Sequence, residues 1–290
     1  MIHKSVLVNE VLEYLRPVAD ENMVDGTCGE GGHTKWLLEK TAPRGKVLGI
    51  DADAKQVESA RRNLTGFSER LVLTHDSYAH IKEIIAKHHF GPVNGILLDL
   101  GYSSWQMDAS GKGFSFLKDE PLDMRYGNGE LTAAEIVNEW PEKELEKIIS
   151  EYGEERFAKQ VATAIVRQRK ISSIKNTFDL VTIIEESIGR KYRAERIHCA
   201  TRTFQALRIA VNGELENLQK ALPEALEVLA PGGRLVVISF HSLEDRIVKN
   251  FFKSQENIKL LTNKPVTASD EEIASNPRAR SAKLRAIVKI

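Results

Sequence analysis

A short glycine-rich stretch between an apolar segment and a helical one constrains this chain more than any other feature. The apolar pair Met23-Val24 ends in Asp25, residues 26–32 contain four glycines, and a helix-compatible run begins at Thr34. Glycine has no Cβ, so a turn of this composition allows backbone N–H groups to approach a ligand closely. The start of the following helix attracts polar or anionic ligand atoms. The order of strand, glycine turn and helix therefore indicates a ligand-binding turn.

An acidic residue follows this turn at the spacing expected of a nucleoside site. The second apolar run, residues 47–50, ends in Asp51, which lies 20 residues after Gly31. An acid at that point of the next strand is placed to accept hydrogen bonds from a ribose diol. A purely structural turn between strand and helix is the alternative, and the spacing of Asp51 favours the nucleoside site over it.

The turn also favours one class of nucleoside cofactor. A dinucleotide site has the pattern G-x-G-x-x-G, whereas this chain has Asp25, Thr27, Gly29 and Gly31 at alternate positions. That pattern resembles the first motif of class I methyltransferases, which bind S-adenosylmethionine, with Thr27 where those proteins often have a glycine. The acidic Asp25 argues against a bound pyrophosphate and suits a cationic methionine moiety.

Length and composition limit the remaining possibilities. A chain of 290 residues is long enough for one main domain with an insertion. Lys plus Arg and Asp plus Glu number 41 each, so the net charge identifies no partner. The two cysteines, Cys28 and Cys199, fit no metal-binding spacing, and we expect no metal site and a reducing, cytoplasmic location. No signal peptide or membrane-spanning run is recognisable.

Apolar strands alternate with helical segments through the first hundred residues. Beyond the two strands above, the sequence predicts strands at residues 70–74 and 95–101, and a later one at 234–240. Continuous apolar strands of this kind form a parallel sheet with helices on both faces. An acid follows each of the first four strands, at Asp25, Asp51, Asp76 and Asp99. Because ligands bind at the carboxyl ends of such strands, the sequence predicts an α/β fold with its site at that edge.

The pattern changes after Gly101. Residues 102–130 form a long loop rich in Gly, Ser and Asp. The helices predicted after it span residues 132–149, 155–169, 177–188 and 200–222, the first with a capping box at Thr132. We therefore predict a sheet domain of residues 1–106 and 211–290 that carries a helical insertion, residues 107–210. Residues 284–290 are predicted to form an edge strand.

Charge is distributed unevenly in the predicted insertion. Residues 156–208 contain 12 Lys or Arg and 4 Asp or Glu, and residues 118–155 contain 4 and 12. The tail, residues 276–285, has no acidic residue. Such patterns suit either solvated faces or a surface that contacts phosphates.

Eight stretches together resemble one family, the RsmH/MraW family of bacterial S-adenosylmethionine-dependent methyltransferases. They are spread over essentially the whole chain, at residues 3–7, 25–33, 99–104, 113–116, 121–125, 201–212, 239–246 and 276–285. The resemblance implies a class I (Rossmann-like) methyltransferase sheet with an inserted helical subdomain that recognises RNA. It also implies methylation of N4 of a cytidine in the decoding region of small-subunit (16S) ribosomal RNA.

The family's cofactor contacts are carried over by motif. S-adenosyl-L-methionine is expected to contact Gly31, Gly32, His33, Asp51, Tyr78, Asp99 and Gln106. Two residues depart from the family's pattern between the last two of these positions. Tyr102 replaces a small apolar residue and Trp105 replaces a proline, which puts the shape of the loop near the target base in doubt.

Two residues are predicted to be catalytic, Asp99 and His241. The amine of cytosine is a poor nucleophile, and an acceptor for one of its hydrogens stabilises the charge that develops on it. Amino-methyltransferases have an acid or amide where Asp99 stands, followed by an aromatic where Tyr102 stands, which suggests Asp99 at the amine and Tyr102 stacked on the base. The alternative is that Asp99 contacts only the cofactor. His241 is predicted to accept a proton or contact RNA, or else to cap the next helix.

Further residues of the loop keep two interpretations. Phe114 and Phe116 suit base stacking or core packing. Asp123 and Arg125 suit an ion pair that fixes the loop or a contact with substrate.

The expected partner is small-subunit ribosomal RNA or the assembled small ribosomal subunit, with no DNA and no membrane. The sequence does not determine the oligomeric state. Two other functions compete with methyl transfer. One is a non-catalytic RNA-binding or ribosome-assembly protein that retains a nucleoside site. The other is a nicotinamide-dependent oxidoreductase, which the missing G-x-G-x-x-G disfavours.

Overall fold

A computed structural model describes residues 4–101, 104–127, 129–192 and 197–290. The chain divides into two compact units, one of residues 1–101 and 215–290 and one of residues 102–214. The boundaries lie a few residues from those expected, at 106 and 211. We call them the sheet unit and the helical unit and describe each by itself.

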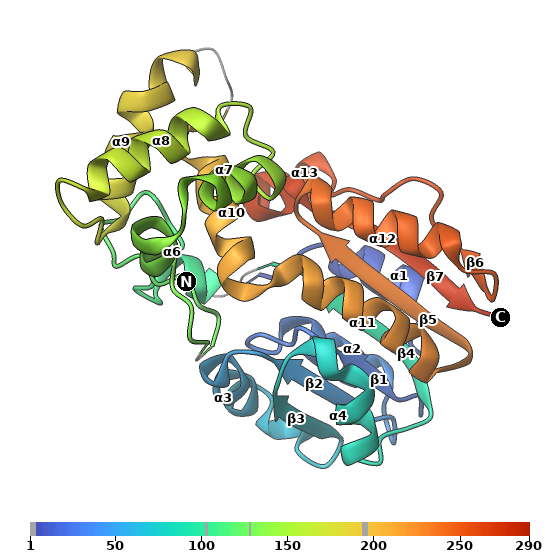
Figure 1. Cartoon of the computed structure of the whole chain (residues 1–290). Coiled ribbons are helices and arrows are strands. Elements are labelled where there is room, and N and C mark those ends of the chain that lie inside the picture. The colour runs from blue at the N-terminus through green and yellow to red at the C-terminus, as the bar shows by residue number, and fades with distance from the viewer. Residues whose placement is uncertain (1–3, 102–103, 128, 193–196) are drawn as a thin grey trace. The chain divides into compact units, whose positions relative to one another are not determined.

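Within the described residues, seven strands form one sheet in the order β3-β2-β1-β4-β5-β7-β6 (Figure 1). The strands are β1(Met23–Asp25), β2(Val47–Asp51), β3(Leu71–His75), β4(Val93–Asp99), β5(Leu229–Ser239), β6(Ile258–Leu260) and β7(Lys283–Lys289). β1 to β5 run parallel, and β7 is antiparallel to β5 and β6. This arrangement confirms the predicted class I, Rossmann-like methyltransferase sheet with a helical insertion.

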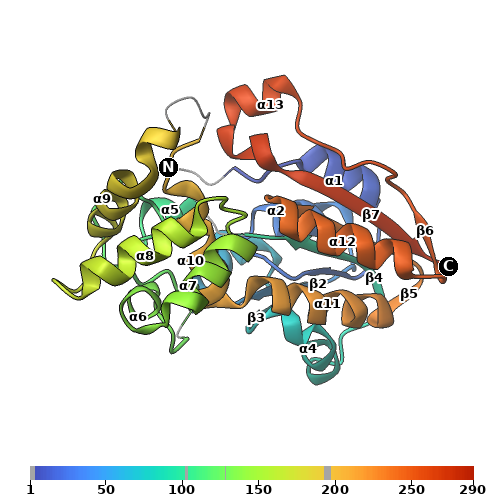
Figure 2. The same ribbon diagram turned by 45° about the horizontal axis from the view of Figure 1, so that its top comes forward.

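Helices cover both faces of the sheet. The helices of this unit are α1(Val8–Leu15), α2(Gly32–Lys40), α3(Ala54–Asn63), α4(Ile81–Lys87), α11(Glu214–Val228), α12(Ser242–Ser254) and α13(Asp270–Ser275). Ile96 and Leu98 of β4 pack in one core with α4, α11 and α12, and Leu97 packs in another with α1 and α2. Figure 2 shows α1 on one side of the strands and α4 and α11 on the other. Each such side chain, once fully buried, stabilises the fold by about 1.5–3 kcal/mol.

The strand order places the predicted site. The chain runs outward from β1 to β2 and β3, then crosses back so that β4 pairs with the other side of β1. Ligands bind at the carboxyl edge where the order reverses in this way. The turn that follows Asp25 and the end of β4 at Asp99 both lie at this point.

The last strand differs from its prediction. Residues 284–290 were expected at an edge, but β7 pairs with β5 on one side and with the short β6 on the other. β6, only three residues long, is the edge strand. A strand this short carries no periodic signal in the sequence, so the prediction missed it.

The helical unit contains helices around a core of its own. Its helices are α5(Ser104–Asp108), α6(Ala133–Glu139), α7(Glu142–Glu151), α8(Ala158–Arg169), α9(Thr177–Ile188) and α10(Thr201–Asn212). The predicted capping box is confirmed, since the hydroxyl of Thr132 accepts from the Glu135 N–H and the Glu135 carboxylate accepts from the Thr132 N–H.

Two long helices of the prediction are each divided in two. The segment 132–149 is interrupted by Pro141, and α7 begins after it. Proline has no backbone N–H, so it cannot donate the next hydrogen bond of α6. The segment 200–222 is interrupted by Gly213, which has the left-handed φ of 57° and ends α10. The prediction of single helices was wrong because apolar periodicity continued across both breaks.

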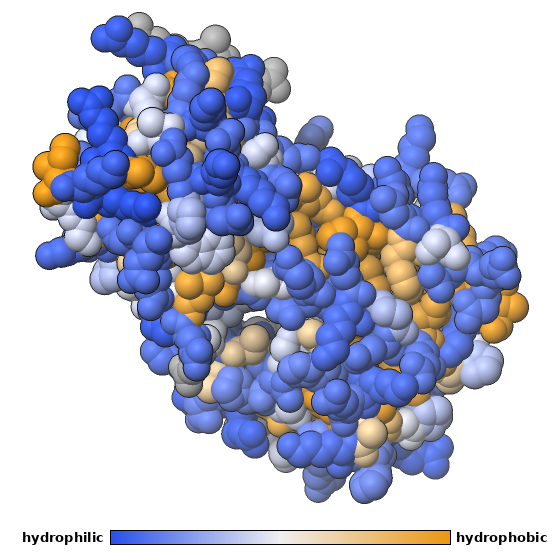
Figure 3. Space-filling model, in the orientation of Figure 1, coloured by the Kyte–Doolittle hydropathy of each residue, from blue (hydrophilic) through white to orange (hydrophobic). Residues whose placement is uncertain are grey.

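Polar residues dominate the surface. Charged residues make up 28% of the chain, and the visible face in Figure 3 is largely hydrophilic. Some large apolar side chains are exposed, among them Leu117, Ile171 and Phe178. In the described part of the chain, helices that combine the length and the apolar character needed to cross a bilayer are absent.

Gly213 at the end of α10 and Gly189 at the end of α9 form a matched pair for substitution. We expect Gly213→Ala to lower the free energy of unfolding by about 1–2 kcal/mol, since a Cβ is unfavourable at left-handed φ. Gly189, at the end of α9, has φ −54° and an ordinary Cβ environment, so Gly189→Ala should be neutral or stabilising by about 0.4–1 kcal/mol. Urea unfolding measures both, and equal effects of the two substitutions would contradict this assignment.

Candidate active site

The glycine turn after β1 is held by backbone hydrogen bonds. Cys28 donates its N–H to the carbonyl of Ile50 at 2.9 Å, and Gly31 donates to the carbonyl of Cys28 at 2.8 Å. Gly31 has φ 93°, and a Cβ there would lie 2.7 Å from Cδ1 of Leu64. Position 31 therefore requires glycine for both its conformation and its space, and α2 starts directly after it.

Asp25 is an internal support of this turn. It is 0% exposed, accepts from the Thr34 hydroxyl at 2.6 Å, and accepts from the Thr27 N–H at 3.2 Å. Burial raises the pKa of Asp25, and these hydrogen bonds only partly offset that effect. The carboxylate is enclosed and joins the turn to α2, and its predicted suitability for a cationic methionine moiety stays a prediction.

Asp51, at the end of β2, faces the same turn. Its carboxylate accepts from the N–H of Gly29 at 2.8 Å and from the N–H of Asp53 at 2.9 Å. Burial raises the pKa of Asp51 to about 6, although both N–H groups favour the ionised form. A carboxylate offers about four acceptor positions, so Asp51 can accept further hydrogen bonds from a diol.

Thr27 joins the turn to β4. The backbone N–H of Asp99 donates to the Thr27 hydroxyl at 2.7 Å. Class I methyltransferases often have a glycine at the position of Thr27, and a glycine would have no hydroxyl to make this contact. The side chain at position 27 thus fixes the end of β4 against the glycine turn.

His33 and Asp99 form a pair beside the turn. Nε2 of His33 lies 3.4 Å from Oδ2 of Asp99, and the two side chains are 7% and 18% exposed. Burial alone would lower the pKa of His33, but the contact with Asp99 and its charge, with the charges of Asp25 and Glu272, raise it above its ordinary value. Oδ1 of Asp99 is buried and has no hydrogen-bond partner among the described residues. A buried acceptor without a partner carries an unfavourable free energy of about 1–3 kcal/mol, which a ligand that donates to it can relieve.

Tyr78, which follows β3, lies beside the glycine turn. It opens the short 3-10 helix Tyr78–His80, and its Cβ would lie 3.3 Å from a Cβ built on Gly26. The preceding acid has a local role, since Asp76 accepts from the N–H of Ser77 at 2.7 Å and contacts the His80 ring at 2.8 Å. The structure therefore brings Tyr78, Asp51 and the glycine turn to one edge of the sheet, while Asp76 supports its own loop.

His241 is the N-cap of α12. Its ring nitrogen Nδ1 accepts from the Glu244 N–H at 3.5 Å, and Nε2 lies 3.3 Å from Oε1 of Glu244. Glu244 in turn accepts from the Phe240 N–H at 2.8 Å. The structure thus supports the helix-capping interpretation, and a catalytic role of His241 stays a prediction.

Comparison with known proteins agrees with this geometry. Residues 1–290 match the MraW methylase family. A relative from Kosmotoga olearia, named ribosomal RNA small subunit methyltransferase H, is 50% identical over 99% of this chain and 97% of its own. Relatives with the same name from Heliobacterium modesticaldum and Syntrophotalea carbinolica are each 47% identical, over 99% and 98% of this chain and 98% and 97% of their own.

This chain belongs to the MraW methylase family. S-adenosyl-L-methionine is therefore its methyl donor. The residues at the edge of the sheet fit that molecule, because Asp51 offers acceptors for a ribose diol, Gly31 leaves room for close approach, and Asp99 has an unpaired buried oxygen. Which residues contact the methyl donor stays a prediction.

Two predicted residues belong to the helical unit. Gln106 lies in α5 and is 5% exposed, and its backbone carbonyl accepts from the Ser110 hydroxyl at 2.6 Å. Its contact with the methyl donor stays a prediction. Tyr102 lies outside the described residues, so its predicted stacking on the base is not addressed by the structure.

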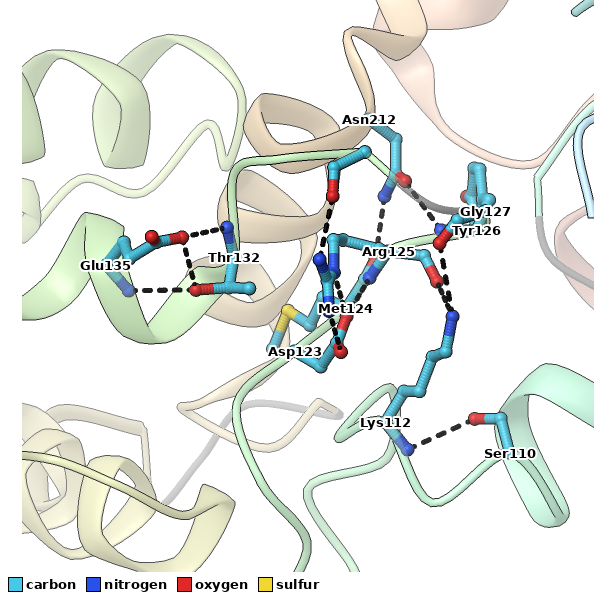
Figure 4. A network of polar contacts seen from close by, with 11 residues as sticks. Ser110, Lys112, Asp123, Met124, Arg125, Tyr126, Gly127, Thr132, Glu135 and Asn212 are labelled. Atoms are coloured by element: carbon cyan, nitrogen blue, oxygen red, sulfur yellow. Dashed lines mark hydrogen bonds and ion pairs between the residues drawn. The ribbon is translucent and has the colours of Figure 1, made fainter.

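Hydrogen bonds and an ion pair hold the loop around residue 123 of the methylase (Figure 4). Arg125 forms an ion pair with Asp123, with Nη2 to Oδ2 at 2.7 Å. Burial would raise the pKa of Asp123, but the hydrogen bonds and charge of Arg125 lower it. Lys112 donates to the carbonyls of Arg125 and Gly127, and Asn212 of α10 accepts from the Tyr126 N–H. These contacts support the interpretation in which Asp123 and Arg125 fix the loop.

The aromatic residues of the loop take different places. Phe114 is 7% exposed and stacks on Tyr126, with ring centroids 5.7 Å apart. Core packing therefore explains Phe114 without a base. Phe116 is partly buried and stacks on His198, with centroids 5.0 Å apart.

A cluster that the sequence analysis missed lies near this stack. Glu185, His198 and Cys199 place ligand atoms within 4.8 Å of one another. Nδ1 of His198 accepts from the Ala200 N–H, and Nε2 contacts Glu185 at 3.2 Å. A metal at Nε2 would require the ring proton on Nδ1, where the Ala200 N–H already points. The arrangement favours a hydrogen-bonded histidine over a metal ligand.

Several arginines of the basic stretches bind partners inside the protein. Arg285 is 7% exposed and pairs with Asp245 at 2.6 Å. Arg208 pairs with Glu214 at 2.7 Å, and Arg169 donates to the backbone carbonyls at the end of α6. For these three residues the contacts favour a structural role over contact with phosphates, because each guanidinium binds a partner inside the protein. Arg278 and Arg280 are exposed.

Residues 4–7 contact residues 272–276 in the sheet unit, which the sequence did not indicate. The carboxylate of Glu272 in α13 accepts from the Leu7 N–H at 2.7 Å. Asn276 donates to the carbonyl of Lys4, and Lys4 donates to the Ser275 hydroxyl. Residues 4–7 and 272–276, far apart in sequence, thus lie together, and the charge of Glu272 also acts on His33.

The raised pKa of Asp51 predicts a pH dependence for binding of the methyl donor. If the ionised carboxylate accepts from the ribose diol, affinity should be constant above pH 6 and fall by up to about tenfold per pH unit below it, as protons compete. Asp51→Asn should weaken binding by about 1.5–3 kcal/mol and abolish this dependence. Isothermal titration between pH 5 and pH 8 measures both, with the surface substitution Asp20→Asn as control. A Kd that is independent of pH in the unmodified protein would rule out the ribose assignment.

Proposed function

We propose that this methylase transfers the methyl group of S-adenosyl-L-methionine to N4 of a cytidine in the decoding region of small-subunit ribosomal RNA. The name that these relatives share supports the class of RNA, and the whole-chain resemblance supports N4 and the decoding region. The observation that carries the chemistry is the buried, unpaired Oδ1 of Asp99 at the carboxyl end of β4. An amine that donates a hydrogen bond is a suitable partner for that oxygen.

The cofactor edge has one role for each residue. The bound methyl donor supplies a methyl group on a positively charged sulfur. The turn at Gly31 and Gly32 allows close backbone approach, Asp51 accepts from the ribose, and Tyr78 lies where the adenine is expected. These assignments follow the family motif and the geometry of the sheet edge.

Asp99 has the acceptor role in the reaction. The cytosine amine must form one N–C bond while the donor's C–S bond breaks and its electron pair stays on sulfur. The amine then carries positive charge and releases one proton. A carboxylate oxygen that accepts from the amine stabilises this charge and can receive the proton. The backbone hydrogen bond from Asp99 to Thr27 holds the acceptor in place before the reaction.

RNA contact is assigned to exposed basic residues. In the sheet unit these include Arg278 and Arg280, and in the helical unit Lys159, Arg167 and Lys170. Contacts to phosphate give affinity that falls with salt and carry no sequence information of their own. Selection of one cytidine therefore has to come from residues that contact the base and not from these charges.

The acceptor role of Asp99 predicts the effect of one conservative change. Asp99→Asn keeps the shape but removes the charge, so single-turnover methylation of small subunits at saturating donor should slow by about 100-fold or more. Donor affinity should change much less. If Asp99 only contacts the donor, the loss should appear in affinity, and saturating donor should restore most of the rate. A near-normal rate at saturation would overturn the acceptor role, and no methylation by the unmodified protein would leave an RNA-binding protein.

The salt dependence of RNA binding tests the basic surface. Changing Arg278 and Arg280 to Glu should reduce the slope of log Kd against log salt by about 0.7 for each lost contact on single-stranded RNA. Donor binding should be unchanged. Arg285→Ala is the matched control, because it removes a buried partner of Asp245 and should cost about 3–5 kcal/mol of stability without altering the slope of the folded protein. Equal slopes for the unmodified protein and the double variant would exclude a phosphate role for Arg278 and Arg280.

A further inference from the structure

His33 was expected to contact the methyl donor, but its surroundings indicate a different task. The side chain is 7% exposed and starts from the first turn of α2, directly after Gly32. Its Nε2 lies 3.4 Å from Oδ2 of Asp99, an ion-pair contact, and has no hydrogen-bond partner among the described residues. Little of this side chain is left to meet a ligand, and its one polar neighbour is the carboxylate at the end of β4.

The carboxylate of Asp99 depends on this contact. Its backbone is fixed by Thr27, but its side chain has only His33 as an ion-pair partner in the described part of the chain. A carboxylate without a second contact is free to rotate about its Cα–Cβ and Cβ–Cγ bonds. A contact on Oδ2 fixes that rotation and determines where Oδ1 lies.

We propose that His33 is a positioning residue of the methylase, which holds Asp99 through Oδ2 so that Oδ1 is kept for the substrate amine. This inference rests on the acceptor role proposed for Asp99. In its protonated form His33 donates from Nε2 to Oδ2, and its positive charge compensates the buried carboxylate. The proton that leaves the amine goes to Asp99, and His33 itself forms no bond to substrate or donor.

The charges around His33 favour its protonated form. Asp99 faces it from β4, Asp25 from the end of β1 and Glu272 from α13, and together they outweigh the effect of burial and raise its pKa. The protonated pair is therefore complete below the ordinary histidine pKa of about 6.5. It is lost as pH rises through the raised value. Deprotonation of His33 should weaken its hold on Asp99 and slow methyl transfer.

Two variants separate positioning from donor binding. His33→Ala removes the contact, and we expect single-turnover methylation at saturating donor to fall about 10–100-fold, the scale of a misplaced reacting group. His33→Gln keeps a neutral N–H donor at a similar reach, and should recover part of that rate. The unmodified protein should lose rate on the alkaline side as His33 deprotonates, and His33→Gln should lack that limb. His88→Ala is the control, since His88, at the end of α4, contacts Thr74 of β3 and not Asp99.

Nuclear magnetic resonance of the His33 ring gives a second measurement that does not depend on turnover. In Asp99→Asn the pKa of His33 should fall relative to the unmodified protein, because its nearest negative charge is gone. An unchanged His33 pKa would overturn the pairing. Equally, a loss in His33→Ala that saturating donor restores would make His33 a donor contact and overturn the proposal. If the unmodified protein methylates no cytidine, the proposed function fails instead, and the resonance titration still decides the pairing.

Discussion

The parallel pairing of β1 between β2 and β4 is the constraint on which the site depends. It sets Asp25 against Gly49 on one side and against Leu97 on the other, so the turn after β1 lies beside the ends of both neighbours. Hydrogen bonds then close the arrangement from each side. The Gly29 N–H reaches Asp51 at the end of β2, and the Thr27 hydroxyl receives the N–H of Asp99 at the end of β4.

Charge inside this edge is balanced against burial. Asp25, Asp51 and Asp99 all lie at one sheet edge, and the described residues that face them include one imidazole, His33. Backbone N–H groups and the Thr34 hydroxyl compensate two of the carboxylates. Only Asp99 keeps a buried oxygen without a partner, which distinguishes it from the two acids that support the turn.

The sequence predicted the sheet, and it predicted that the glycine turn, Asp51 and Asp99 lie at one edge of it, because these signals are local. Apolar runs ending in Asp, a glycine turn and an acid 20 residues later all depend on nearby spacing. Long-range features were less predictable. Nothing local shows that Arg285 pairs with Asp245, that Glu272 binds the Leu7 N–H, or that Asp25 is enclosed. Helix ends were missed at Pro141 and Gly213, where one residue overrides a continuing apolar pattern.

The charge counts in the helical unit show the same limit. Twelve basic residues in 156–208 suggested one phosphate surface, but the structure uses Arg169 to end α6 and Arg208 to pair with Glu214. A count cannot distinguish a guanidinium that binds a carbonyl from one that faces solvent. Burial and partners make that distinction, and they leave a smaller set of exposed residues for RNA.

We propose that residues at this edge of the sheet methylate one cytidine of small-subunit RNA at N4. Mass mapping of the nucleosides after incubation of unmethylated small subunits with the protein and S-adenosyl-L-methionine tests it most directly. We predict a single new methylated cytidine in the decoding region, with the methyl group on N4. Methylation at carbon 5, at a ribose or at another base would contradict the amine-acceptor role of Asp99, and no new methyl group would contradict the proposed activity.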